Sequence, residues 1–161
     1  MMRLVLVTAV AGLVCGAVAA AAATRPGIAG NRIGAVTLGE PKARVTKALG
    51  GSTPVQIQGG SYRFYRNAGI YVLYGTKRGL PRRARTVLTR SARYQTSSAI
   101  GVGASLRQLR RTMDVRCHPT GRWIECVHGL SFQPSQRPKM LFQLSKANKR
   151  VNRIAITSPR Y

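Results

Sequence analysis

Residues 4–23 form an uncharged apolar run that follows Arg3 and ends in a string of alanines. A short basic start, an apolar middle and a small-residue A-x-A end are the features of a cleavable export signal. The run is also about twenty residues long, enough to span a membrane, so an uncleaved anchor is the alternative. We expect cleavage, because the alanine-rich end is weakly hydrophobic, and we assign residues 1–23 to a signal peptide.

Two segments that lie sixty-four residues apart share one pattern of apolar and polar positions, VTLGEPKARVTKAL at 36–49 and IGVGASLRQLRRTM at 100–113. Each has a short apolar lead that ends at a glycine, followed by a helix start, since Pro41 suits a first helical turn and Ser105 suits an N-cap. Apolar residues then recur at helical intervals. The pattern predicts a tandem repeat with one short amphipathic helix in each copy. The matched pairs are Val36 with Ile100, Leu38 with Val102, Gly39 with Gly103, Val45 with Leu109, and Leu49 with Met113.

After each helix the apolar spacing changes to that of strands. The first copy predicts a hairpin of residues 62–66 and 70–74, then a basic loop at 77–85 and an extended stretch at 87–94. The strands predicted for the second copy are 114–118, 123–128, 139–144 and 151–157.

These elements predict an α+β fold of two tandem modules. Each module has one or two short helices packed on a three- to four-stranded antiparallel sheet. An N-terminal linker, 24–35, precedes the first module at 36–94 and the second at 95–161.

The segment V-T-L-G-E-P-K-A-R-V-T-K-A-L-G at 36–50 resembles the repeat of the β-lactamase inhibitory protein family and its relatives among small outer-membrane assembly lipoproteins. The resemblance implies that each repeat packs a helical hairpin on a four-stranded sheet, and that two repeats form a concave saddle that grips a partner protein. The second copy departs from it, because its helix ends at Met113-Asp114 and not at Leu-Gly. The turn at 67–69 also lacks the acidic residues through which the inhibitor grips its enzyme. Inhibition of β-lactamase is therefore not carried over, and no site residue is transferred.

Basic residues outnumber acidic ones by 27 to 3, for a net charge of +24, which becomes +23 when Arg3 leaves with the signal. Such a chain attracts polyanions, including nucleic acid and acidic surface polymers. An arginine-rich genomic composition is the alternative reason for the charge. The candidate polyanion contacts, interleaved with aromatic residues or in the basic loop, are Arg63, Arg66, Arg82, Arg83 and Arg85.

Two cysteines, Cys117 and Cys126, remain after cleavage, and in an exported protein such a pair favours a disulfide. A two-residue turn at Gly121 and Arg122 would place them opposite each other in a hairpin. His118 and His128 lie close by and are possible zinc ligands, but His118 would point away from Cys117 on its strand. We therefore predict a bridge and no metal.

The tryptophan Trp123 lies beside this bridge and has two interpretations. It packs against the disulfide in the core, as buried aromatics do in small domains. Alternatively it is exposed on the sheet with Tyr71 or Tyr74, as an anchor of a protein interface. The candidate interface residues are therefore Tyr71, Tyr74 and Trp123.

Groups for acid–base catalysis are scarce, since the chain has three acidic residues and two histidines. Glu125 would face His118 across the hairpin, an ordinary cross-strand pair. We predict no catalytic residue, no cofactor and no enzyme. The expected function is a secreted or cell-envelope, extracytoplasmic module that binds an unidentified protein partner, without a membrane span after cleavage. The alternative is a basic binder of an anionic surface polymer or nucleic acid, and an uncharacterised hydrolase comes third.

Overall fold

The computed structural model describes residues 26–57, 60–75, 82–128 and 138–158. The predicted signal peptide, 1–23, lies outside the described residues, as does most of the predicted basic loop. The described elements, in chain order, are β1 (Gly27–Ala29), β2 (Arg32–Ile33), β3 (Val36–Thr37), α1 (Lys42–Leu49), β4 (Thr53–Ile57), β5 (Gly60–Tyr65), β6 (Ile70–Tyr74), β7 (Ala84–Thr89), β8 (Gln95–Thr96), α2 (Leu106–Thr112), β9 (Val115–Thr120), β10 (Trp123–His128), β11 (Lys139–Ser145) and β12 (Val151–Thr157).

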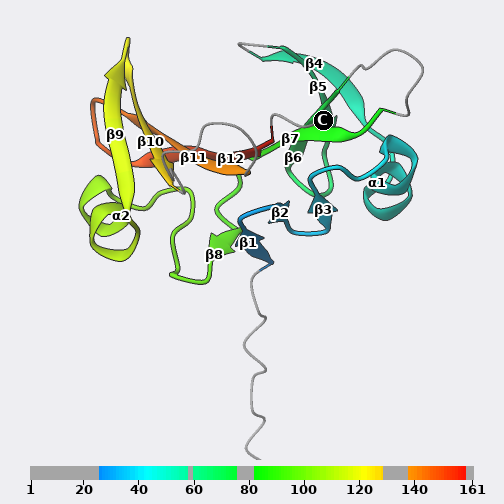
Figure 1. The fold of residues 1–161 in the computed structure, drawn as a ribbon. Coiled ribbons are helices and arrows are strands. Elements are labelled where there is room, and N and C mark those ends of the chain that lie inside the picture. Colours follow the sequence, from blue (N-terminus) through cyan, green and yellow to red (C-terminus); the bar gives the residue numbers. More distant parts are fainter. Residues whose placement is uncertain (1–25, 58–59, 76–81, 129–137, 159–161) are drawn as a thin grey trace, which may run out of the picture.

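Eight strands form one continuous sheet in the order β4-β5-β6-β7-β12-β11-β10-β9. Every neighbouring pair in it is antiparallel. The two halves of the chain meet in the middle, where β7 pairs with β12 from Thr86↔Thr157 to Thr89↔Ile154. The outer strands at both ends rise on the same side, so that one face of the sheet is concave (Figure 1).

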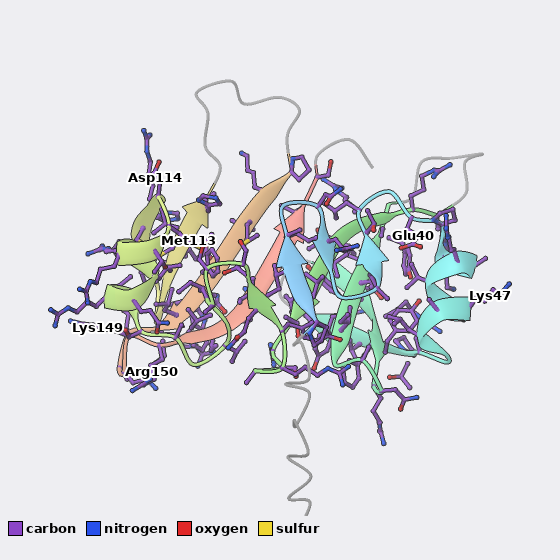
Figure 2. All side chains as sticks on the ribbon, turned by 90° about the horizontal axis from the view of Figure 1, so that it is seen from below. Glu40, Lys47, Met113, Asp114, Lys149 and Arg150 are labelled. Carbon is purple, nitrogen blue, oxygen red and sulfur yellow. A yellow bond between two sulfur atoms is a disulfide. The ribbon has the colours of Figure 1, made fainter. Side chains whose placement is uncertain are left out.

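The opposite, convex face is covered by the two helices and a second sheet. The small sheet has the order β3-β2-β1-β8. It lies beneath the middle of the large sheet, with α1 and α2 at opposite ends (Figures 1 and 2). Side chains along each strand point alternately to the two faces of the sheet. One set therefore faces the covered side, and the other set faces the concavity.

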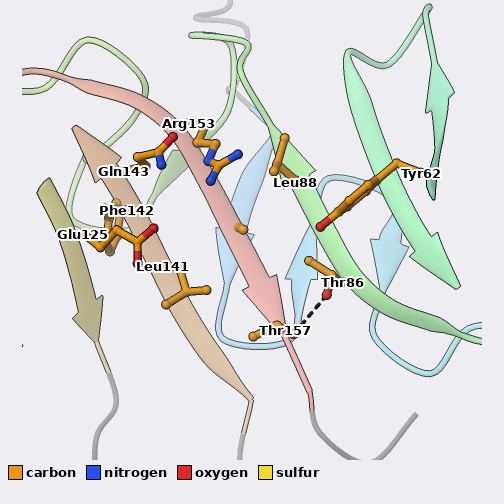
Figure 3. Close-up of a pocket in the computed structure, with 10 residues that line it drawn as sticks. Tyr62, Thr86, Leu88, Glu125, Leu141, Phe142, Gln143, Arg153 and Thr157 are labelled. Carbon is orange, nitrogen blue, oxygen red and sulfur yellow. Dashed lines mark hydrogen bonds between the residues drawn. The ribbon is translucent and has the colours of Figure 1, made fainter. Parts of the chain in front are cut away.

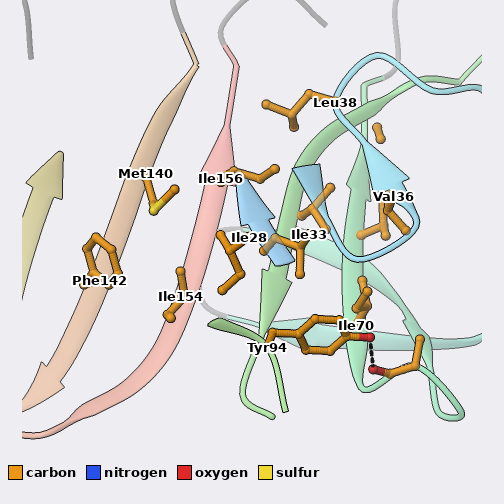
Figure 4. Close-up of a cluster of buried hydrophobic side chains, with 14 of the residues drawn as sticks. Ile28, Ile33, Val36, Leu38, Ile70, Tyr94, Met140, Phe142, Ile154 and Ile156 are labelled. Atoms are coloured by element: carbon orange, nitrogen blue, oxygen red, sulfur yellow. Dashed lines mark hydrogen bonds between the residues drawn. The ribbon is translucent and has the colours of Figure 1, made fainter. Parts of the chain in front are cut away.

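The hydrophobic core lies between the large sheet and the elements beneath it. Ile28 and Ile33 of the small sheet belong to one buried cluster with Ile154 and Ile156 of β12 (Figure 4). Of the segment predicted as a linker, residues 27–33 thus form β1 and β2 and contribute to the core. These strands are too short to produce a readable alternation in the sequence.

The prediction of two α+β modules is wrong, because the fold is mostly β. Among the described residues there are only two helices, of 8 and 7 residues, whereas twelve strands form sheets of 4 and 8 strands. The strand content exceeds the prediction because short segments ahead of the first helix form β1, β2 and β3. The two predicted sheets are also one, since each half alone would leave β7 or β12 with an unpaired edge.

Several local predictions are confirmed. The strands predicted at 123–128 and 151–157 coincide with β10 and β12, and Ser105 caps α2 by accepting a hydrogen bond of 3.1 Å from the Gln108 amide. Cys117 and Cys126 form a disulfide, with a Cα–Cα distance of 4.0 Å. The intervening turn has Gly121 at a φ of 53°, a conformation that favours glycine.

The bonds around the two matched glycines correspond. Gly39 and Gly103 have φ values of 83° and 95°. Arg83 donates a hydrogen bond of 2.9 Å to the Gly39 carbonyl, and Arg150 donates one of 2.9 Å to the Gly103 carbonyl. The same guanidinium-to-carbonyl hydrogen bond therefore links the segment before α1 to the start of β7, and the segment before α2 to the start of β12.

Candidate functional site

The concave face of the large sheet carries aromatic and aliphatic side chains that the core does not use. On β6, Val72 is fully buried on the covered side, so the alternate residue Tyr71 faces the concavity. Phe64 of β5 is paired with Tyr71, and their rings stack with centroids 4.4 Å apart. An apolar surface therefore remains on the side of the sheet that no described helix or strand covers.

One hollow of about 170 Å³ lies over the centre of this face. Tyr62, Leu88 and Arg153 project into it from β5, β7 and β12, and Glu125 lies at its β10 side (Figure 3). The hydroxyls of two further lining residues, Thr86 and Thr157, are hydrogen-bonded to each other at 2.9 Å. The junction of the two halves is thus the floor of the hollow.

A second hollow, of about 700 Å³, joins the two ends of the face. Val55 and Ile57 of β4 line it from the first half, and Trp123 of β10 lines it from the second. Gln143 and Arg153 line both hollows, so the two lie next to each other. Although β4 and β10 are distant in the order of the sheet, its curvature brings their side chains to one depression.

Guanidinium groups lie among these rings. Arg90 lies over Tyr71, with its Cζ atom 5.9 Å from the ring centroid, and Arg122 lies over Trp123 at 5.6 Å. Such cation–π contacts hold a guanidinium against an aromatic face.

Arg153 occupies a more buried position between the two hollows. Burial lowers the pKa of its guanidinium from the usual value, and the neighbouring charge of Arg90 lowers this pKa further, whereas Tyr62 and Glu125 act in the opposite direction. Burial also raises the pKa of Tyr62, and the charge of Arg153 opposes that shift. The guanidinium therefore lies against another cation in a partly desolvated site.

The predicted pairing of Glu125 with His118 is confirmed, since the two residues are cross-strand partners and the Nε2–Oε2 distance is 3.8 Å. Both side chains are substantially exposed, and neither hollow brings a cysteine or a second carboxylate to them. The pair is an exposed cross-strand contact of a common kind. Within the described ranges, no three His, Cys, Asp or Glu side chains gather as a metal site.

Two of the three candidate interface residues lie together. Tyr71 and Trp123 line the same hollow. Tyr74 does not, because it is three residues from Tyr71 and faces the covered side, where its hydroxyl is 2.7 Å from that of Tyr65. The same spacing separates Trp123 from Cys126, so the prediction that Trp123 packs against the bridge in the core is wrong.

The five candidate polyanion arginines do not converge on one site. Arg63 donates hydrogen bonds of 3.1 and 3.0 Å to the hydroxyl and carbonyl of Ser52, and Arg83 is bonded to Gly39. The other three, Arg66, Arg82 and Arg85, are exposed and line neither hollow.

The arginines that do line the concave face are Arg90, Arg122 and Arg153. Sequence reasoning missed all three. Arg90 could have been found because every second residue of a strand lies on the same face, which places Arg90 with Thr86 and Leu88. This inference requires knowing first which face those two residues occupy.

No protein-family model matches the chain, and no curated protein matches it. A crystal structure of yfeY, an uncharacterized protein from Escherichia coli, is similar to this chain with a TM-score of 0.43 and 12% sequence identity. The similarity covers 76% of this chain and 92% of that chain. In the part of the chain that the structure describes, no helix is long and apolar enough to cross a membrane. The disulfide is compatible with an extracytoplasmic location.

Proposed function

We propose that this protein is a secreted or envelope-located, non-enzymatic module that binds a partner protein on the concave face of its eight-stranded sheet. The observation that carries the proposal is the hollow shared by Tyr71 and Trp123, two aromatic residues from different halves of the chain. Tyrosine, tryptophan and arginine are the residues most enriched at the energetic centres of protein interfaces. Here they lie together on a face that the described elements leave open.

The resemblance to the β-lactamase inhibitory protein family remains part of this proposal. It is supported by the four strands that each half contributes to one concave face, which is the surface that family uses to grip its partner. Among the described residues each half has one helix in place of a helical hairpin, which is a departure from that family.

The test is capture of secreted and envelope proteins on the immobilised, oxidised protein, with retained proteins identified after a high-salt wash. The informative comparison is with Trp123→Ala, because truncation of an interface anchor typically costs about 2 kcal/mol or more, roughly thirtyfold in affinity. Leu49→Ala is the control, since this half-buried apolar residue lies on α1, on the opposite side of the sheet. A protein kept by the wild type and the control but lost by Trp123→Ala supports the proposal. A protein retained equally by all three contradicts it.

The alternative function, binding of an anionic polymer, is favoured by a different surface. A hollow of about 710 Å³ on α2 is lined by four cationic side chains and no acidic one, with Arg107, Arg110, Arg111 and Lys149 contributing the charge. Binding there would depend steeply on salt, because it releases counterions from the polymer. Loss of all retained material in high salt, with polymer or nucleic acid in the wash, selects this function.

A further inference from the structure

The concave face has three guanidinium groups whose contacts within the described part of the chain are aromatic rings or the charge of a single carboxylate. Within the described part of the chain, the side chains of Arg90, Arg122 and Arg153 donate no hydrogen bond and form no ion pair. Each guanidinium has five N–H donors in a fixed planar arrangement. The two neighbouring hollows therefore present many unused donors.

Negative charge is scarce around these groups within the described residues. Glu125 is the one carboxylate among the described lining residues, and it lies 3.8 Å from His118 while its charge also acts on Arg153. One carboxylate therefore faces three guanidinium groups. Of the two other acidic residues in the sequence, Glu40 contacts Arg44 and the Thr37 amide, away from this face. Arg90 also lies close enough to Arg153 for its positive charge to disfavour the charged form of Arg153. An incoming anion would relieve this repulsion and gain charge-assisted hydrogen bonds.

The surroundings of the arginines distinguish a protein segment from a nucleic acid or an anionic polysaccharide. Arg90 and Arg122 already lie over Tyr71 and Trp123, which reduces the ring area on which bases could stack. Val55 and Ile57 form an apolar wall beside the guanidinium groups. A sugar–phosphate or uronate chain has no apolar side chains to cover that wall, whereas a protein segment can present a carboxylate next to a phenylalanine or leucine.

We propose that the concave face recognises an acidic segment of a partner protein, with a carboxylate seated among Arg90, Arg122 and Arg153 and an adjacent aromatic or aliphatic side chain against Val55 and Ile57. This inference rests on the proposed function and adds the chemistry of the partner to it. The charge complementarity also gives specificity, because a basic segment at the same place would bring like charges together.

The probes are three labelled peptides of equal length: alternating glutamate and phenylalanine, alternating glutamine and phenylalanine, and glutamate alone. Heparin and single-stranded DNA represent the anionic polymers. Binding to the oxidised protein is measured by fluorescence anisotropy. The test variant is the triple substitution Arg90→Gln, Arg122→Gln and Arg153→Gln. The control, Arg66→Gln, Arg82→Gln and Arg85→Gln, removes the same charge from exposed positions outside the hollows. Circular dichroism verifies that both variants are folded.

The glutamate–phenylalanine peptide is expected to bind the wild type and the control alike, and the test variant about tenfold or more weakly. The glutamine–phenylalanine and all-glutamate peptides are expected to bind the wild type more weakly than the mixed peptide. Equal losses in both triple variants would show that net charge alone acts, and would overturn the inference. Heparin or DNA binding that depends more on the concave arginines than peptide binding does would overturn it in favour of a polymer. Absence of binding of the mixed peptide to the wild type would also overturn it.

The failure of this inference and that of the proposed function are distinguishable. A captured protein that is lost by Trp123→Ala but retained by the concave arginine triple leaves the proposed function standing and removes the acidic segment. A captured protein that neither variant loses removes both.

Discussion

Reduction of the Cys117–Cys126 bridge should destabilise the protein by an amount that follows from the length of the loop it closes. The two cysteines are separated by 9 residues. The chain-entropy relation for a loop of this size gives about 2.6 kcal/mol at 25 °C, lost when the unfolded chain regains that freedom. For a domain of this size the loss corresponds to a decrease in Tm of roughly 10 °C.

The position of the bridge makes the effect visible in two separate signals. β9 is an edge strand that pairs only with β10, and most of its residues are exposed. Trp123, at the start of β10, is the single tryptophan of the sequence and reports on this hairpin. Urea unfolding of the oxidised protein should give coincident transitions by fluorescence and far-UV circular dichroism. In the reduced protein both midpoints should fall, with the fluorescence change preceding the dichroism change where the hairpin frays first.

The double variant Cys117→Ala and Cys126→Ala is the control, because its stability should not respond to the reductant. Coincident midpoints for the oxidised and reduced wild type would refute the entropic reasoning. A loss far above 5 kcal/mol would refute it as well, since the loop-closure term alone cannot supply that much. The bridge would then act through contacts in the folded state.

Three further outcomes are expected. Leu109→Ala should lower the free energy of unfolding by about 2–5 kcal/mol in urea titrations, because the Leu109 side chain is fully buried. Leu106→Ala in the same helix should lower it less, since Leu106 is half-buried, and equal losses would contradict the assigned core. Gly34→Ala should cost about 1–3 kcal/mol by thermal unfolding, since φ is +55° and the added Cβ would lie 2.7 Å from Cε1 of Tyr94; an unchanged Tm would disprove this contact. Burial raises the pKa of Tyr74 above that of an unfolded tyrosine. The free energy of unfolding should therefore not change with the ionisation of Tyr74 near neutral pH, and should decrease as the pH rises above about 10. Tyrosine absorbance showing that all six tyrosines ionise before the protein unfolds would contradict this prediction.

The local elements were predictable because they depend on neighbouring residues. Ser105 marks the start of α2 through its own side chain, and the turn at Gly121 sets the register that joins Cys117 to Cys126. Strand alternation likewise predicted β10 and β12 at their observed bounds.

The candidate site was only partly predictable, because it depends on which face of each strand is covered. Alternation shows that Tyr71 and Tyr74 lie on opposite faces, but it does not show which face meets the core. That choice is made by α1, α2 and the small sheet, which includes two strands from the segment predicted as a linker. The pairing of β7 with β12, which produces the shared sheet, is equally absent from any local pattern.

The pairing of β7 with β12 also constrains the order in which the protein can fold. The middle of the sheet is completed only when residues 154–157 reach residues 86–89, whereas every other neighbouring pair of strands described in the sheet is consecutive in the chain. Hairpins within each half can therefore form early, while the central contact requires closure of a long loop and forms slowly. Until then β7 presents an open edge, which is prone to association between nascent chains. A chaperone that shields this strand during synthesis would thus increase the yield of native protein more than one that acts on the strands at either end of the sheet.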